Sequence, residues 1–320
     1  MTKPVLWITR KLSDATEARA ARDYDVISNP EDRVFSTDEI IAMSAKVDAI
    51  LPCHSEVFSQ DVAQRLSDRV KIIANHSVGV DHCNLPALKT RGIVVTNTPD
   101  VLSDATAEIA LLLMLAAARR GSEGDRLMRT GQWSSWSPSF MVGVQTTGKK
   151  LGIIGMGRVG LAVKKIVSGL GMEVHYSNRR RLPPETENGA IYHDSVDDLL
   201  GAVDVVSLNC PSTPETVNLM NRHRLGLMKK GAILVNTARG NLIDEDALID
   251  ALKSGRLFAA GLDVFKTEPG GNPELAKLDN VFLLPHIGSA TRETRDAMGF
   301  RALDNLDAFF AGKEPRDRLV

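Results

Sequence analysis

LGIIGMGRVG, at Leu151–Gly160, is the stretch of this sequence that decides the fold. A hydrophobic run, which predicts a β-strand, leads into Gly155, Gly157 and Gly160 at the spacing GxGxxG, and a helical pattern follows at Leu161–Leu170. In this context the first glycine permits a tight turn, the second lets the backbone approach a pyrophosphate, and the third lets the helix pack on the strand. The stretch therefore predicts a dinucleotide site; the alternative is a glycine-rich turn without a ligand.

Outward from this stretch, short β-rich runs alternate with helical patterns along the chain, as in parallel sheets that are covered by helices. A long apolar helix is expected at Ala105–Ala118 and a polar connection at Gly121–Lys150. Strands are expected in two series, at Val5–Thr9, Asp25–Ser28, Val47–Leu51, Val70–Asn75 and Ile93–Thr96, and then at Leu151–Gly155, Glu173–Ser177, Val203–Asn209, Ala232–Asn236, Ala259–Asp263 and Val281–Leu284. The expected fold class is α/β, with two Rossmann-like, doubly wound parallel-sheet domains and a cleft between them.

The composition of the 320 residues, 43% hydrophobic and 25% charged, is that of a globular protein and excludes disorder as the main state. A formal net charge of −1 gives no general attraction to nucleic acid or to an anionic membrane, so neither partner is expected. Cys53, Cys83 and Cys210 lie far apart and show no CxxC spacing, which argues against disulfides and a metal site. We therefore expect a cytoplasmic protein that holds no metal.

The strand after the glycines ends at Asn178, and Arg179, Arg180 and Arg181 follow directly. An NAD site usually has Asp or Glu at this place, about 20 residues beyond the glycines, to hold the ribose 2′-hydroxyl. Guanidinium groups instead bind a 2′-phosphate through charge-assisted, often bidentate hydrogen bonds. We expect NADP(H) rather than NAD(H), bound in part by Asn178, Arg179 and Arg180; the alternative is a solvated basic loop.

Three motifs place polar side chains where predicted strands of the second series end. They are VNTARG, which contains Arg239, LDVFKTEP, which contains Glu268, and LLPHIGSAT, which contains His286. Ligands of open α/β sheets bind beyond the carboxyl ends of the strands, so the three side chains are expected to converge. Taken singly, each has another interpretation, as a strand-end cap, a solvated loop acid or a buried structural imidazole.

The chemistry of 2-keto acid reduction explains why these three residue types occur together. Arg239 would bind the carboxylate and carbonyl oxygens with its planar fork of donors. His286 would give the carbonyl oxygen its proton, because an imidazole exchanges protons near neutral pH. Glu268 would orient the ring and stabilise its charged form, and the nicotinamide would supply the hydride.

Further motifs connect the whole chain to one family. SVGVDHCNL at Ser77–Leu85, NTPDVLSDATAEIALLLMLAAAR at Asn97–Arg119 and NCPSTPETVNLMN at Asn209–Asn221 precede or separate those above. In this order the motifs resemble the D-isomer-specific 2-hydroxyacid dehydrogenase family, and HYSNRRRLP is similar to the NADP-type loop of its glyoxylate/hydroxypyruvate reductase branch. The resemblance implies NADPH-dependent reduction of small 2-keto acids, such as glyoxylate and hydroxypyruvate, to D-2-hydroxy acids.

The resemblance also implies binding residues that spacing alone does not identify. Arg239, Glu268 and His286 would be the catalytic set, and the backbone N–H groups of Val78 and Gly79 would bind the substrate carboxylate. Cofactor contacts would come from Thr106, Arg158, Val159, Cys210, Pro211, Thr216, Thr237, Ala238, Asp263 and Gly288.

A discontinuous domain organisation is implied as well. Residues 1–100 and 290–320 would form a flavodoxin-like substrate-binding domain, and residues 101–289 an NADP-binding Rossmann domain, with a hinge at the two crossings. The family resemblance implies a homodimer, formed through the helix from Ala105 and the stretch GQWSSWSPSF. Trp133 or Trp136 would then reach the neighbouring active site; the alternative is that both pack locally.

Other activities stay open at this point. The enzyme could act on another small oxyacid, such as phosphite, or on a larger 2-keto acid, whereas Glu268 counts against formate because formate dehydrogenases of the family carry Gln there. The wider family also contains transcriptional corepressors, so a dinucleotide-sensing co-regulator is a further alternative. Those proteins lack a basic loop like the one after Asn178 and usually carry long tails.

Overall fold

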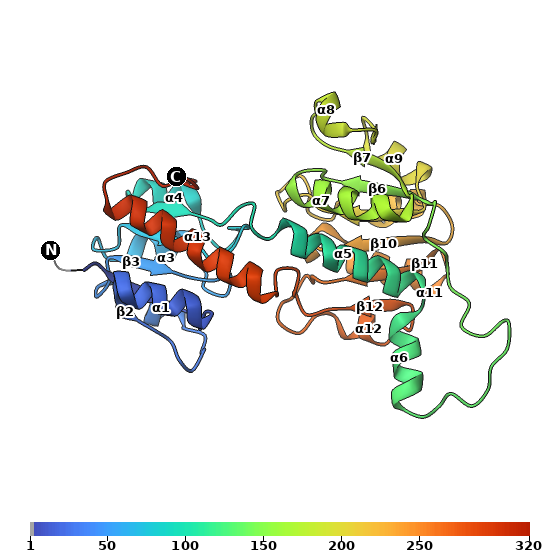
Figure 1. The fold of residues 1–320 in the computed structure, drawn as a ribbon, viewed down its shortest axis with the longest axis horizontal. Helices are drawn as coiled ribbons and strands as arrows, with labels where there is room; N and C mark the ends of the chain where they lie inside the picture. The colour runs from blue at the N-terminus through green and yellow to red at the C-terminus, as the bar shows by residue number, and fades with distance from the viewer. Residues whose placement is uncertain (1–2) are drawn as a thin grey trace. The chain divides into compact units, whose positions relative to one another are not determined.

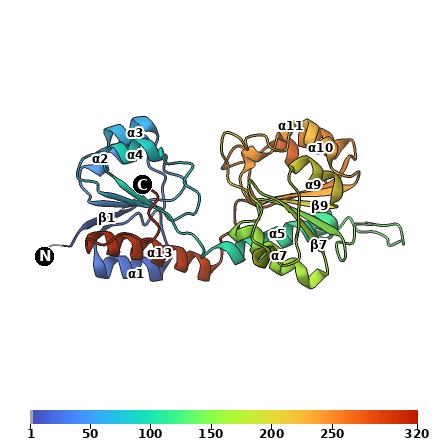
Figure 2. The same ribbon diagram turned by 90° about the horizontal axis from the view of Figure 1, so that it is seen from above.

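The chain folds into two compact units, which Figures 1 and 2 display. This computed structural model describes residues 3–320. One unit contains the chain up to Leu102 together with Ala290–Val320, and the other contains Ser103–Ser289. The first unit is therefore assembled from two separate parts of the sequence.

The first unit has a five-stranded, fully parallel sheet in the order β2-β1-β3-β4-β5. This 2-1-3-4-5 order is the flavodoxin-like form of a doubly wound sheet. Its elements are β1 (Val5–Ile8), α1 (Asp14–Asp23), β2 (Asp25–Ile27), α2 (Thr37–Ser44), β3 (Ala49–Leu51), α3 (Gln60–Arg65), β4 (Ile72–Ala74), α4 (Leu85–Thr90), β5 (Val94–Thr96) and α13 (Arg292–Phe310).

Helices cover both faces of this sheet, because successive strand residues point to opposite sides. Leu6 and Ile8 of β1 pack with Leu303 of α13 on the face that α1 and α13 cover. Trp7, between them, packs on the opposite face, which α2, α3 and α4 cover in Figure 2. The end of the chain then closes the edge of the sheet, where the Leu319 N–H donates to the carbonyl of Val95 at 2.8 Å.

The second unit has a seven-stranded, fully parallel sheet in the order β12-β11-β10-β9-β6-β7-β8. Counted from β6, this is the Rossmann order 3-2-1-4-5-6 with one further strand, so the predicted fold class is confirmed. Its elements are α5 (Ser103–Ala118), α6 (Gly121–Arg129), β6 (Lys150–Ile154), α7 (Arg158–Val167), β7 (Glu173–Ser177), α8 (Pro184–Glu187), β8 (Ile191–Tyr192), α9 (Val196–Ala202), β9 (Val205–Leu208), α10 (Arg222–Leu227), β10 (Ala232–Asn236), α11 (Glu245–Lys253), β11 (Leu257–Leu262), α12 (Pro273–Ala276) and β12 (Val281–Leu283), with short 3₁₀ turns at Ser168–Leu170 and Gly240–Leu242.

Two details differ from the expected elements. The polar connection expected at Gly121–Lys150 begins with helix α6, which has no buried residue and carries ion pairs such as Arg126–Asp279 at 2.6 Å. Such a helix gives little apolar signal, because none of its residues belongs to the core. The two-residue strand β8 is too short to show a period of its own.

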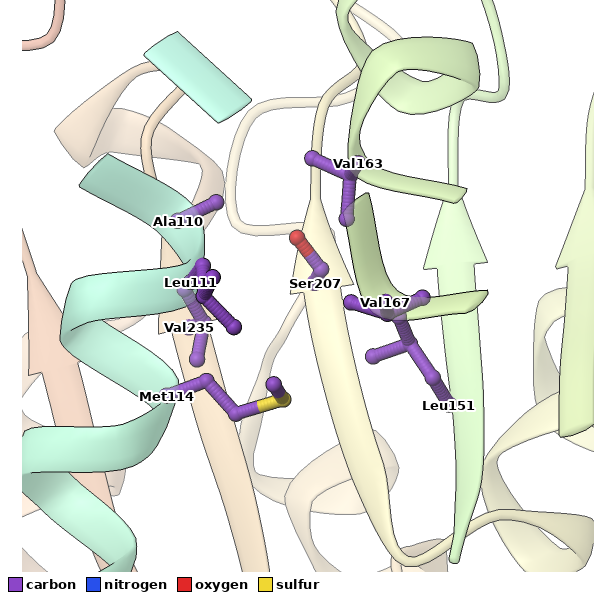
Figure 3. Close-up of a pocket in the computed structure, with 8 residues that line it drawn as sticks. All are labelled: Ala110, Leu111, Met114, Leu151, Val163, Val167, Ser207 and Val235. Atoms are coloured by element: carbon purple, nitrogen blue, oxygen red, sulfur yellow. The ribbon is translucent and has the colours of Figure 1, made fainter. Parts of the chain in front are cut away.

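A small apolar void lies between α5, α7 and the strands, and Figure 3 shows its lining. Its volume is about 10 Å³, which is room for one water molecule at most. Ser207 is the polar residue among those that line it, and its hydroxyl donates to Asn209 at 2.9 Å. The void is therefore a packing gap and not a ligand site. Within residues 3–320, no helix combines the length and apolar character needed to cross a bilayer.

Candidate active site

The turn between β6 and α7 requires glycine at two of its three glycine positions and leaves the backbone open at the third. Gly155 has φ +92°, and a Cβ there would lie 2.5 Å from the backbone nitrogen of Cys210. At Gly160 a Cβ would lie 2.7 Å from the carbonyl oxygen of Gly155, so the helix could not pack against the turn. At Gly157 a Cβ would meet nothing within 4 Å, so the backbone there is open to a bound molecule.

This turn lies at the point where the strand order of the sheet reverses. β6 pairs with β7 on one side and with β9 on the other. From β6 the chain continues outward through β7 to β8, and it then returns to the other side of β6, where β9, β10, β11 and β12 follow in the opposite direction. Dinucleotides bind in the crevice at such a switch point, so the open backbone at Gly157 fits a pyrophosphate. Cys210 follows β9 beside this turn, and burial raises the pKa of its thiol to about 11, which keeps it protonated.

The loop after β9 and the turn after β10 carry further residues expected at the cofactor. The Thr216 hydroxyl donates to the carbonyl of Pro211 at 2.9 Å and accepts from the Thr213 N–H at 2.7 Å, which closes the first loop on itself. The Asn209 amide reaches the hydroxyl of Thr237 at 3.4 Å and so connects the two segments.

The basic loop after β7 is more ordered than its charges alone suggest. The side-chain oxygen of Asn178 accepts from the Met156 N–H at 2.7 Å, so Asn178 ties this loop to the glycine turn. Arg181 forms a two-point ion pair with Glu187, at 2.7 and 3.0 Å. Arg179 and Arg180, between these two anchored positions, are exposed.

Arg239 lies in the turn that follows β10, and a buried amide shapes this turn. Asn236, the last residue of β10, donates to the carbonyl of Arg239 at 2.8 Å and accepts from the Ala238 N–H at 3.0 Å. The Arg239 guanidinium in turn donates to the Ala238 carbonyl at 2.7 Å. Asn236 was not predicted as a site residue; its role follows from the structure, in which its amide is fully buried at the end of the strand.

Glu268 and His286 form a close carboxylate–imidazole pair. Nδ1 of His286 lies 2.6 Å from Oε2 of Glu268, and the other carboxylate oxygen accepts from the Phe265 N–H at 2.7 Å. The side chain of His286 keeps 33% of its surface exposed, so the ring is accessible at the site. Its backbone has φ +54°, a left-handed conformation that is uncommon outside glycine and is often found at functional sites.

Asp263, at the end of β11, holds the loop that carries His286. Its two carboxylate oxygens accept from the N–H groups of Ile287 at 2.8 Å and Gly288 at 2.7 Å, and its carbonyl accepts from the His286 N–H at 2.8 Å. Burial raises the pKa of Asp263, whose residue surface is only 1% exposed. Thr106, also buried, donates to the Gly288 carbonyl at 3.2 Å. Asp263 and Thr106, which are both expected at the cofactor, thus hold the loop at Ile287 and Gly288 in place.

Gly240 brings the Arg239 turn against the loop that carries Glu268. A Cβ on Gly240 would lie 1.8 Å from the carbonyl carbon of Phe265 and 2.3 Å from the nitrogen of Lys266. Phe265 is the residue whose N–H binds Glu268. This role of Gly240 could not be predicted from the sequence, because the need for glycine arises from a segment 25 residues further along the chain.

In the first unit, the turn at Val78 and Gly79 presents backbone donors. The Asn97 amide donates to the Val78 carbonyl at 2.8 Å, and the Ser77 hydroxyl donates to the Gly79 carbonyl at 2.8 Å. Neither N–H group of Val78 and Gly79 donates to another group among residues 3–320. Adjacent peptide N–H groups of this kind suit a carboxylate. Asn97, which sequence reasoning did not single out, fixes the turn.

The paired carboxylate and imidazole are suited to acid–base chemistry. An ionised Glu268 requires the proton at Nδ1 of His286, which orients the ring and leaves Nε2 to exchange a proton with a substrate oxygen. The adjoining Arg239 turn supplies a cation that is always charged. These groups lie beyond the carboxyl ends of β10, β11 and β12, on the edge that also carries the glycine turn.

Comparisons with known proteins identify relatives that cover nearly the whole chain. Residues 111–288 match the model of the NAD binding domain of the D-isomer specific 2-hydroxyacid dehydrogenases. The chain is 42% identical over 316 residues to a glycerate dehydrogenase of Hyphomicrobium methylovorum, covering 98% of each, and 42% identical over 318 residues to a glyoxylate reductase of Pyrococcus furiosus, covering 98% of this chain and 94% of the other. An NADPH-dependent glyoxylate/hydroxypyruvate reductase of Sinorhizobium meliloti, solved with NADP and malonate, superposes with a TM-score of 0.87 at 29% identity, covering 100% of this chain and 97% of that one.

The chain therefore belongs to the D-isomer specific 2-hydroxyacid dehydrogenase family, as the order of its motifs predicted. Within it, the relatives place the chain in the glyoxylate reductase branch: it is an oxidoreductase that uses a nicotinamide dinucleotide on small keto or hydroxy acids.

Proposed function

We propose that this protein reduces glyoxylate and hydroxypyruvate with NADPH in the cytoplasm, yielding glycolate and D-glycerate. The observation that carries the proposal is the hydrogen-bonded pair of His286 and Glu268, whose atoms lie 2.6 Å apart. The close packing of Gly240 against Phe265 brings the turn that carries Arg239 next to the loop that carries Glu268. An acid–base pair beside a fixed cation is what a 2-keto acid requires.

The reaction follows from the roles of these side chains. Arg239 holds the carboxylate and polarises the carbonyl, and the N–H groups of Val78 and Gly79 bind carboxylate oxygens. When bound, the reduced nicotinamide supplies the hydride to the carbonyl carbon. His286 delivers a proton from Nε2 to the carbonyl oxygen, which completes the hydroxy acid. Glu268 stabilises the charged imidazole before this transfer and keeps the ring in place afterwards.

The preference for NADPH is supported by the end of β7. No carboxylate stands at Asn178, whose amide is engaged with Met156, while Arg179 and Arg180 are exposed beside it. A carboxylate at this place would repel a 2′-phosphate, whereas guanidinium groups attract it. The Sinorhizobium meliloti relative, which was solved with NADP, supports the same cofactor.

The proposal predicts activity in a defined assay. NADPH oxidation followed by absorbance should be fast with glyoxylate and hydroxypyruvate and slower with pyruvate, phenylpyruvate and 2-ketoisocaproate. The value of kcat/KM with NADPH should exceed that with NADH by about tenfold or more, the worth of one charge-assisted contact. Equal or better efficiency with NADH would remove the cofactor preference, and no turnover of any keto acid would overturn the function.

A second candidate is oxidation in the reverse direction. The Hyphomicrobium methylovorum relative is named a glycerate dehydrogenase, and oxidation of glycerate at C2, the carbon next to the carboxylate, gives hydroxypyruvate. The same residues serve this reaction, because His286 would then accept the proton it otherwise donates. The substrate panel also decides between these small acids and a larger 2-keto acid.

We also propose that the protein is a homodimer. After α6 the chain runs out from the body of the second unit and returns to β6 (Figure 1). This stretch exposes 51% of Trp133, 73% of Trp136 and 59% of Val142. Exposed apolar groups that gather on one segment mark an interaction surface.

Light scattering should accordingly give the mass of two chains at micromolar concentration. A Trp133→Ser, Trp136→Ser double variant should shift this mass towards one chain, because it removes the two largest exposed apolar side chains of the segment. A Trp136→Ala variant should lower activity or change substrate preference if the side chain reaches the neighbouring site. Full activity with an unchanged preference would mean that Trp136 packs locally.

A further inference from the structure

A buried carboxylate lies behind the basic loop. Glu187, the last residue of α8, is 5% exposed, and it accepts two hydrogen bonds from Arg181 and one from the hydroxyl of Tyr176. The Tyr176 hydroxyl also accepts from the Leu182 N–H at 3.0 Å. Glu187 thus fixes the C-terminal end of the loop in two ways. It binds the side chain of Arg181 directly, and through the Tyr176 hydroxyl it holds the backbone at Leu182.

The near end of the same loop has its own anchor. Asn178 is bound to Met156 of the glycine turn, and its carbonyl accepts from the Tyr192 hydroxyl at 3.4 Å. Two residues, Arg179 and Arg180, lie between the anchors, and both are exposed. The loop is therefore fixed on either side of the residues that are proposed to bind the 2′-phosphate.

We propose that Glu187 is a positioning residue for the adenosine 2′-phosphate: by holding Arg181 and Tyr176 it orders the loop that presents Arg179 and Arg180. The inference rests on the proposed preference for NADPH. A loop that is ordered in advance loses less conformational entropy on binding, so the same arginines give a tighter complex. Arg181 acts within this scaffold and does not itself bind the phosphate.

The sign of the effect separates this role from simple electrostatics. A carboxylate close to a phosphate site repels the phosphate, so neutralising Glu187 should strengthen phosphate binding if charge alone counts. Neutralising it weakens binding only if the carboxylate positions the arginines. The hydrogen bonds from Arg181 and Tyr176 lower the pKa of Glu187 to about 2, so its carboxylate stays ionised throughout the pH range of a binding assay.

The test measures binding of two small probes, adenosine 2′,5′-bisphosphate and adenosine 5′-monophosphate, by isothermal titration calorimetry of the full chain. The ratio of their dissociation constants isolates the contribution of the 2′-phosphate without requiring catalysis. Glu187→Gln removes the charge and keeps the size. Glu185→Gln is the matched control, because Glu185 lies in the same short helix and is exposed.

In Glu187→Gln we expect the preference for the bisphosphate to fall about tenfold, the worth of one charge-assisted hydrogen bond, with affinity for the monophosphate unchanged. Glu185→Gln should retain the preference or increase it slightly. Tyr176→Phe keeps the buried ring and removes the hydroxyl that binds Glu187. It should therefore lower the preference for the bisphosphate by an intermediate amount, which is a second test of the role of Glu187. An unchanged or stronger preference in Glu187→Gln would overturn the inference.

The wild-type protein provides the remaining distinction. If it binds the bisphosphate no better than the monophosphate, the proposed NADPH preference is wrong and the inference fails with it. If the wild type shows the preference and Glu187→Gln keeps it, only the role of Glu187 is rejected.

Discussion

Replacing His286 by alanine should lower kcat for glyoxylate reduction by about a thousandfold, which is the usual worth of a positioned general acid. The affinity for NADPH should stay within about twofold, since the imidazole acts on the carbonyl oxygen and not on the cofactor's phosphates. The reason is structural: Nδ1 is held by Glu268 at 2.6 Å, so the ring is oriented for transfer from its other nitrogen.

The left-handed backbone at His286 calls for a second substitution. Alanine at φ +54° carries a strain of about 1 kcal/mol that asparagine tolerates better, so His286→Asn removes the acid with less disturbance of the loop. Equal losses in both variants assign the effect to proton transfer. His223→Ala, at a side chain that is 72% exposed, is the control and should keep full activity. Normal turnover in His286→Asn would exclude His286 as the acid.

Gly240→Ala should be the most damaging small substitution in the second unit. The new methyl group would lie 1.8 Å from the carbonyl carbon of Phe265, far inside any contact distance, so the backbone at Phe265 must move. Because the Phe265 N–H is hydrogen-bonded to Glu268, this movement would also shift the Glu268 carboxylate away from His286. We expect a loss of stability of about 4 kcal/mol and a fall in kcat/KM of about a hundredfold, because misplacement by about 1 Å is enough for this.

Thermal melting and steady-state kinetics together check this prediction. Gly201→Ala is the matched control, because an added Cβ on Gly201, in α9, meets nothing within 4 Å. Alanine is the better helix former by about 1 kcal/mol, so Gly201→Ala should melt at the same temperature or higher and keep its activity. If Gly240→Ala behaves like this control, the close packing of the two loops does not hold in solution.

The fold could be predicted from the sequence because parallel strands buried on both faces leave continuous apolar runs. The runs at Ile72–Ala74 and Ala232–Asn236 are of this kind, and the strands lie there. The glycine turn was equally readable, since its helix must approach Gly155 too closely for a side chain at Gly160. Helix α6 was not predicted, because it buries no residue and so leaves no apolar pattern in the sequence.

Only some of the residues of the site could be predicted from the sequence. Motifs identify side chains that meet a ligand, whereas supporting residues depend on partners distant in the sequence. Asn178 binds Met156 across 22 positions, and Asp263 binds Gly288 across 25. No local pattern specifies such pairs, so the bracing role of these side chains was not predicted, while their expected contacts with the cofactor stay a prediction. Asn236 is a different case: its partners, Ala238 and Arg239, are close in the sequence, but only the structure shows that its amide is buried and bound to both.

The split first unit bears on how the chain folds as it leaves the ribosome. Ser103–Ser289 is contiguous and can complete its sheet as soon as it has emerged. The earlier-made sheet must wait, because α13 covers Leu6, Ile8 and Leu51 and is synthesised after the whole second unit. Until α13 has emerged, this apolar face lacks part of its cover, so the N-terminal unit is expected to complete its folding after the second unit.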